Sequence, residues 1–124
     1  MMRTCTILVT DRNKYIRELV KRELSFAGYT IHVAENIHEI QSILNSTMEI
    51  DAMILDADLF FVVGDPNELL NMLKIRPKMW TFIHIYKEHP ELQFDNEKTF
   101  CIEKKAGSIE EINLLVKKMC SERE

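Results

Sequence analysis

The sequence predicts one α/β domain, with a parallel sheet covered by helices on both faces. Two observations lead to this fold class. Short apolar runs alternate with segments whose apolar residues recur at helical spacing, almost throughout the chain, and this alternation is typical of parallel sheets. The 124 residues are enough for one domain and not for two. We therefore treat residues 1–124 as a single domain whose crossovers are right-handed.

Five apolar segments have the length and flanking turns of strands. The third is apolar throughout, as expected of a strand that is buried on both faces. The second alternates Ile31 and Val33 with polar residues, which is the period of a strand. The predicted strands are Cys5–Val9, Tyr29–Ala34, Asp51–Leu55, Trp80–Ile85 and Phe100–Ile102.

Helical periodicity fills the first intervals between these strands. Residues 14–27 place their apolar side chains on one face, and Gly28 is well placed to end this helix. Asn36 begins a second helix, because Glu39 stands three residues later as a capping box requires. The front half of the chain therefore has a regular pattern of strand and helix.

The back half has weaker signals. We interpret the apolar stretch 57–63 as a loop and residues 64–67 as a break that starts a short helix. Residues 87–99 include a proline and few apolar residues, so we expect the fourth helix, before the last strand, to be short or irregular. Ser108 opens the final helix, and Glu111 completes a second capping box.

Composition excludes several classes of function. The formal net charge is −4 and basic residues are mixed with acids, so we expect no binding to nucleic acid. No apolar stretch is long enough for a signal peptide or a membrane span. The three cysteines, Cys5, Cys101 and Cys120, lack metal or redox spacing. We interpret Cys5 and Cys101 as small buried hydrophobic residues in a reducing, cytoplasmic compartment.

Polar residues follow four of the predicted strands. The carboxyl ends of parallel strands meet at one edge of the sheet, where the functional groups of such folds gather. The residues expected there are Asp11, Arg12, Asp56, Asp58, Tyr86 and Lys104.

In this order, the residues resemble the receiver domain of response regulators. The run Ile7-Leu8-Val9-Thr10-Asp11 looks like its opening, Asp51-Ala52-Met53-Ile54-Leu55-Asp56 like its third strand, and Ile102-Glu103-Lys104 like its fifth. The resemblance covers nearly the whole chain and is more specific in the front half. It implies a flavodoxin-like (CheY-like) three-layer fold with a five-stranded parallel sheet in the order 2-1-3-4-5.

The resemblance also implies roles for single residues. Asp56 matches the phospho-acceptor and Lys104 the lysine that binds the phosphoryl group. Lys105 is an alternative match, because with it the loop before Ser108 aligns with the family without a gap. The alternation of side chains along the strand favours Lys104, since Ile102 is expected to point inward. Tyr86 stands at the switch position, where the family has a small hydroxyl residue, and either swings or packs in one place.

A metal site is implied in the same way. Family members hold Mg²⁺ with acidic side chains, which match Asp11 and Asp56, and Asp58 can add a third carboxylate. Arg12 stands where a second acid is expected and puts a cation into the site. It either bridges the carboxylates in place of the metal or points to solvent. We therefore expect Mg²⁺ binding that is weak or absent.

The function implied is a receiver module of a two-component (phosphorelay) system. It would not be an enzyme, and would act through contacts with a histidine kinase or another signalling protein, as a monomer or weak dimer. An alternative is a pseudo-receiver that binds partners without phosphate. A remote alternative is a Mg²⁺-dependent phosphatase, because Asp56-Ala57-Asp58 resembles the DxD motif of haloacid-dehalogenase-type enzymes, in which the first aspartate is the nucleophile. That motif normally follows the first strand, however, not the third.

Overall fold

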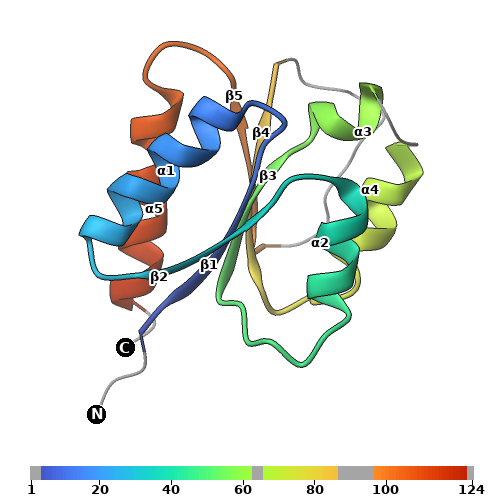
Figure 1. Cartoon of the computed structure of the whole chain (residues 1–124), viewed down its shortest axis with the longest axis horizontal. Coiled ribbons are helices and arrows are strands. Elements are labelled where there is room, and N and C mark those ends of the chain that lie inside the picture. Colours follow the sequence, from blue (N-terminus) through green and yellow to red (C-terminus); the bar gives the residue numbers. More distant parts are fainter. Residues whose placement is uncertain (1–3, 63–65, 87–96, 123–124) are drawn as a thin grey trace.

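In the computed structural model, five parallel strands form one twisted sheet with helices on both faces (Figure 1). The structure describes residues 4–62, 66–86 and 97–122. The strand order is β2-β1-β3-β4-β5, which confirms the predicted fold class and order. The strands are β1 (Thr6–Thr10), β2 (Thr30–Ala34), β3 (Ala52–Asp56), β4 (Trp80–Ile85) and β5 (Thr99–Glu103).

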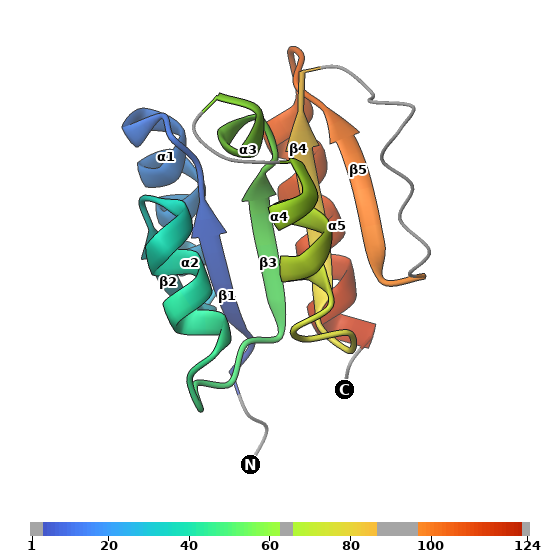
Figure 2. The same cartoon turned by 90° about the vertical axis from the view of Figure 1, so that its right-hand side faces the viewer.

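The helices form the two outer layers. In Figure 1, α1 and α5 cover one face of the sheet, and α2, α3 and α4 cover the other. Figure 2 shows β5 at the edge of the sheet and α4 in front of β3 and β4. The helices are α1 (Lys14–Phe26), α2 (Ile37–Leu44), α3 (Asp58–Val62), α4 (Pro66–Leu73) and α5 (Ser108–Glu122).

Each face of the sheet has its own apolar core, and β3 contributes to both. Met53 and Leu55 point into the core under α2, α3 and α4. Ala52 and Ile54 point into the core under α1 and α5. Every residue of β3 is buried, which is why its sequence is apolar without alternation.

The prediction of a loop at 57–63 was wrong, because α3 occupies Asp58–Val62. Phe60 is fully buried in this turn, and its N–H donates to the carbonyl of Ala57. A buried segment must pair its own backbone groups, and a helical turn does so where an open loop would not. The irregular helix predicted within 87–99 falls mostly on residues 87–96, which lie outside the described residues.

Of the two expected capping boxes, the one at Asn36 forms with its second hydrogen bond displaced by one residue, to Glu35. The N–H of Glu39 donates to the side chain of Asn36 at 2.8 Å, and Glu39 accepts from the N–H of Glu35 at 2.7 Å. The box at Ser108 does not form, because the Ser108 hydroxyl turns inward to a buried histidine, described below. Gly28 ends α1 with a φ of 93°, a left-handed conformation that favours glycine.

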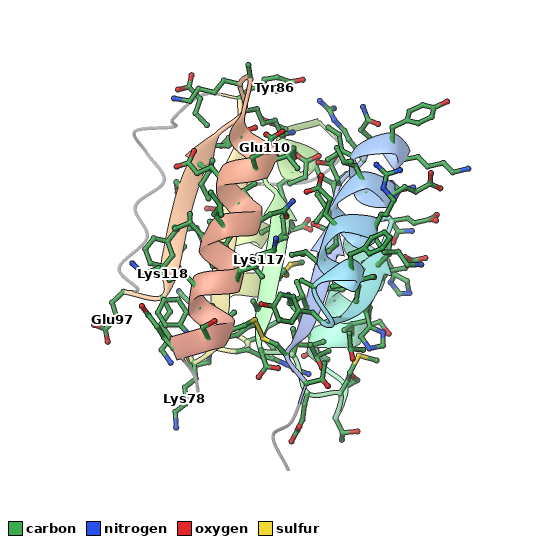
Figure 3. All side chains as sticks on the ribbon, turned by 90° about the vertical axis from the view of Figure 1, so that its left-hand side faces the viewer. Lys78, Tyr86, Glu97, Glu110, Lys117 and Lys118 are labelled. Carbon is green, nitrogen blue, oxygen red and sulfur yellow. A yellow bond between two sulfur atoms is a disulfide. The ribbon has the colours of Figure 1, made fainter. Side chains whose placement is uncertain are left out.

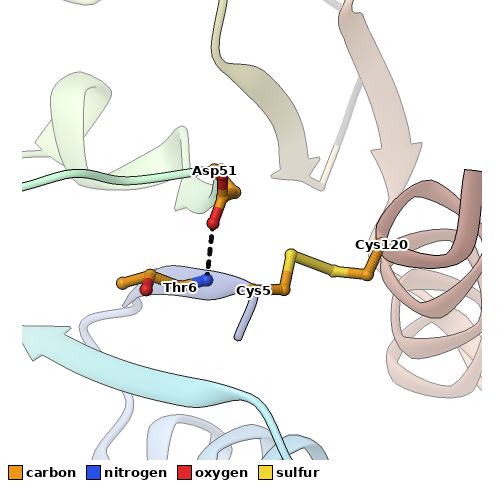
Figure 4. The surroundings of a disulfide bond; sticks show 4 residues. All are labelled: Cys5, Thr6, Asp51 and Cys120. Carbon is orange, nitrogen blue, oxygen red and sulfur yellow. Dashed lines mark hydrogen bonds between the residues drawn. A yellow bond between two sulfur atoms is a disulfide. The ribbon is translucent and has the colours of Figure 1, made fainter. Parts of the chain in front are cut away.

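Cys5 is buried, as predicted, but it is not a reduced hydrophobic side chain. Cys5 and Cys120 form a disulfide that joins the start of β1 to the end of α5 across 115 residues (Figure 4). Next to it, the N–H of Thr6 donates to the carboxylate of Asp51 at 2.8 Å. Cys101, expected to be buried, is instead exposed on the edge strand β5.

The cysteines therefore no longer support a reducing compartment, and the cytoplasmic location stays a prediction. Among the described residues, no helix is both long and apolar enough to cross a membrane.

Candidate functional site

The carboxyl end of β3 carries the most buried acid of the predicted site. Asp56 has no exposed surface. Its Oδ1 accepts from the Lys104 ammonium at 2.7 Å and from the Asp58 N–H at 3.1 Å, and its Oδ2 accepts from the Arg12 N–H at 3.2 Å. Thr10 fixes this strand end, since its hydroxyl accepts from the Asp56 N–H. Such donors stabilise a buried carboxylate that would otherwise be costly.

Lys104 bridges two carboxylates at this edge. Its Nζ lies 2.7 Å from Asp56 Oδ1 and 3.0 Å from Asp58 Oδ2. Burial would lower the pKa of Lys104, but the hydrogen bonds and charges of Asp56 and Asp58 outweigh it and raise the pKa above its usual value. The side chain of Lys105 is exposed, so the structure brings Lys104 rather than its rival to Asp56.

Tyr86 lies at the rim, directly after β4. Figure 3, which looks onto α1 and α5, shows it at one end of the molecule and Lys78 at the opposite end. The ring is 59% exposed and covers Lys104 Nζ, 4.7 Å from the ring centroid. The Tyr86 N–H donates to Asp58 Oδ2 at 3.0 Å. The Tyr86 backbone therefore binds to the charged cluster of Asp56, Asp58 and Lys104, while the Tyr86 side chain covers Lys104 from the solvent side.

Asp11 and Arg12 follow β1 and behave differently from each other. Asp11 is buried, and burial raises its pKa to about 6, with the charge of Asp56 adding to the effect and a hydrogen bond from the Asn13 N–H opposing it. The Arg12 side chain is exposed, and within the described residues no carboxylate pairs with its guanidinium. Of the two alternatives for Arg12, the structure therefore has the one in which it points to solvent. Lys104, and not Arg12, bridges the carboxylates.

His84 also belongs to this region, although no sequence pattern singled it out. It pairs with Asp56 in the β3–β4 register and is 3% exposed. Its Nε2 lies 2.9 Å from the Ser108 hydroxyl. Burial, and then the nearby Lys104 charge, lower the pKa of His84 to about 4, so the ring is neutral at neutral pH. Only strand pairing could have revealed it, because its neighbours along the chain are apolar.

The side chains present do not fit a preformed Mg²⁺ site. Mg²⁺ requires several oxygen ligands in near-octahedral geometry. Asp56 and Asp58 already direct oxygens to Lys104, and Asp11 is protonated more readily than an ordinary carboxyl group. In the part of the chain that the structure describes, no three acidic, histidine or cysteine side chains are grouped to hold a metal ion.

Comparison with solved structures identifies the fold. A CheY-like response regulator receiver domain protein from Methanospirillum hungatei JF-1 matches with a TM-score of 0.76 and 20% identity, over 97% of this chain and 96% of that one. A receiver domain protein from Bacillus halodurans c-125 gives 0.78 and 14%, over 94% and 97%. These matches show that the chain has the fold of receiver domains, as its resemblance to them predicted.

A third match is to a response regulator protein from Burkholderia pseudomallei that contains a phosphorylated aspartic acid, a calcium ion and citrate. Its TM-score is 0.62 and its identity 14%, over 92% of this chain and 71% of that one. No protein-family model matches the sequence, and no curated protein matches it either.

Proposed function

We propose that this chain is a receiver module of phosphorelay signalling and that Asp56 accepts the phosphoryl group. The observation that carries the proposal is the Asp56 carboxylate, buried at the end of the central strand with the Lys104 ammonium at 2.7 Å. A phosphorylated aspartate adds negative charge that needs a cationic partner. The fold supports the same role, and the phosphorylated aspartic acid in the B. pseudomallei protein shows that this fold can carry the modification.

The chemistry would be the transfer of one phosphoryl group. A carboxylate oxygen of Asp56 attacks the phosphorus of a phosphohistidine, an O–P bond forms, and the N–P bond breaks with its electron pair going to the histidine, which then binds a proton. Lys104 balances the charge on Asp56 before and after transfer. The signal would leave by contact with a histidine kinase or another signalling protein, with this chain as a monomer or weak dimer.

We further propose that divalent metal binding at this edge is weak, because the Lys104 ammonium competes for the same oxygens. Titration with Mg²⁺, followed by amide chemical shifts, should show an affinity well below that of a receiver with an intact acid cluster. Arg12→Asp adds the missing acid and should strengthen binding. Tight binding by the unaltered protein would contradict this part of the proposal.

One observation favours the pseudo-receiver alternative. Each oxygen of Asp56 already has a donor, and the residue has no exposed surface, so access for a phosphodonor requires local rearrangement. In that case the Asp56–Lys104 pair would be structural and partners would bind without phosphate.

Acetyl phosphate with Mg²⁺, followed by mass spectrometry, tests the two versions. We expect slow, incomplete labelling that Asp56→Asn abolishes, with small changes in the amide spectrum around β4 and β5. Rapid stoichiometric labelling with large shifts at Tyr86 and Lys104 would indicate a working switch. A complete lack of labelling would favour the pseudo-receiver.

The same preparation tests the expectation that the chain is not an enzyme. A phosphatase of the DxD type would turn over a generic phosphate ester with Mg²⁺, using Asp56 as nucleophile and Asp58 as acid and base. We expect no turnover, because the Asp58 carboxylate pairs with the Lys104 ammonium and accepts from the Tyr86 N–H.

A further inference from the structure

Asp58 makes contacts that the role of Asp56 as acceptor does not explain. A single oxygen of its carboxylate, Oδ2, lies 3.0 Å from Lys104 Nζ and 3.0 Å from the Tyr86 backbone nitrogen. Asp58 begins α3, while Tyr86 follows β4 and Lys104 follows β5. The residue is 8% exposed. One buried anion therefore ties together the ends of three elements at the carboxyl edge.

These two donors are of the kinds that a phosphoryl group on Asp56 would use, and one of them, Lys104, already contacts Asp56. Phosphorylation brings a charge of about −1.5 to −2 and three acceptor oxygens. Lys104 offers a full positive charge, and the Tyr86 N–H is a fixed backbone donor at the end of the neighbouring strand. Tyr86 also directs its side chain over Lys104 and not into the cluster, so the backbone N–H is the group it contributes there.

We propose that Asp58 is a built-in competitor for phosphate. Its carboxylate holds the Lys104 ammonium and the Tyr86 N–H, so the ends of β4 and β5 adopt an anion-bound arrangement before phosphorylation. An incoming phosphoryl group meets a negative charge and must displace the Asp58 side chain to reach these donors. This inference rests on the proposed function, because it takes Asp56 as the acceptor.

Labelling rates test the competition. Asp58→Asn keeps the shape and an acceptor oxygen but loses the charge, and Asp58→Ala loses both. We expect both variants to be labelled by acetyl phosphate about tenfold faster than the unaltered protein, the size expected when one charge-assisted hydrogen bond no longer competes.

Glu103→Gln is the matched control, because Glu103 is an exposed acid beside Lys104 on β5. It removes the same formal charge without touching the two donors, and its labelling rate should stay within about twofold of the unaltered protein, as a screened surface charge predicts. A purely structural role for Asp58 would instead make both Asp58 variants less stable and slower to label.

A second readout does not need phosphorylation. In unlabelled protein, Asp58→Ala should shift the Tyr86 amide resonance and speed its hydrogen exchange, while Asp58→Asn should restore most of its protection. Unchanged exchange at Tyr86 in Asp58→Ala would overturn the inference.

The outcomes separate this inference from the proposed function. Labelling of the unaltered protein at the rate of the Asp58 variants would overturn the competitor role and leave Asp56 as the acceptor. Failure of every variant to be labelled at Asp56, with normal folding, would overturn the proposed function and the competitor role with it.

Discussion

A buried or half-buried cation lies at each end of the sheet, Lys104 at one and Arg76 at the other, and the partners of these two cations differ. At the carboxyl end, Lys104 lies between the carboxylates of Asp56 and Asp58. At the opposite end, Arg76 follows α4, and its hydrogen bonds among the described residues go to neutral backbone oxygens within and just after α2. Those oxygens belong to Ile43, Leu44, Ser46 and Met48, at distances of 2.6 to 3.2 Å.

This difference shows which end of the sheet can respond to chemistry. Backbone carbonyls neither titrate nor accept a phosphoryl group, so neither kind of change acts on the partners of Arg76. One of these partners, the Leu44 carbonyl, belongs to the last turn of α2, where helix carbonyls lack intrahelical partners. The partners of Lys104 are carboxylates, one of them the proposed phospho-acceptor, so modification there can redistribute its contacts.

The largest effect should come from removing the cation of the carboxyl end. Lys104→Met leaves Asp56 and Asp58 buried without their counter-charge, and we expect a loss of about 3–5 kcal/mol in unfolding free energy at pH 7. Urea unfolding measures it, with Lys105→Met as an exposed control that should change stability little. A loss no larger than that of Lys105→Met would contradict this account.

A covalent link strengthens the end of the sheet where Arg76 lies. Cys5→Ser should reduce stability by about 2–4 kcal/mol in the oxidised protein, because the disulfide restricts a loop that spans most of the unfolded chain. Thermal unfolding with and without reductant measures the effect. Cys101→Ser is the control, and reductant should leave the stability of Cys5→Ser unchanged.

Replacement of Arg76 should have a smaller and simpler effect. Arg76→Gln loses most of its hydrogen bonds to α2, and we expect a cost of about 1–3 kcal/mol, since several half-buried carbonyls then depend on water. Measured from pH 5 to pH 8, the cost should be constant, because backbone carbonyls do not titrate. A strong pH dependence would show that a titrating partner had been missed.

The smallest net effect comes from the opposed titrations of His84 and Asp11. The pKa of His84 is about 4 in the folded protein and 6.5 unfolded, so the unfolded state binds more protons between these values. The contribution of His84 to stability is complete above pH 6.5 and is lost as the pH falls, by about 2 kcal/mol between pH 7 and pH 5.

Asp11 opposes this trend, because its raised pKa of about 6 makes the folded state bind the extra proton over much of the same range. His84→Gln should therefore lose less stability than the unaltered protein on acidification, and Asp11→Asn should lose more. Urea midpoints at pH 7, 6 and 5 measure both, and identical pH profiles for the two variants would exclude this assignment.

Several features followed from the sequence alone. The alternation of apolar runs with helical periodicity was enough to predict a sheet between two layers of helices. A strand or helix that is buried on one or both faces has apolar residues at a characteristic spacing, which the sequence alone displays. The resemblance of the segments around Asp11 and Asp56 supplied the strand order, which the sheet confirms. That Asp56 and Lys104 would meet followed from the same order, because both stand at carboxyl ends of parallel strands.

What only the tertiary structure decided concerns partners that are far apart in sequence. Cys5 and Cys120 lie 115 residues apart, and no local pattern signals their bond. Arg12 has the positive charge needed to bridge the carboxylates, yet Lys104 is the residue that lies between Asp56 and Asp58. The direction in which a side chain points depends on packing and not on residue type. The Ser108 hydroxyl bonds to His84 and does not cap the last helix. Packing decides this too, because a buried ring nitrogen needs a hydrogen-bond partner from a neighbouring element.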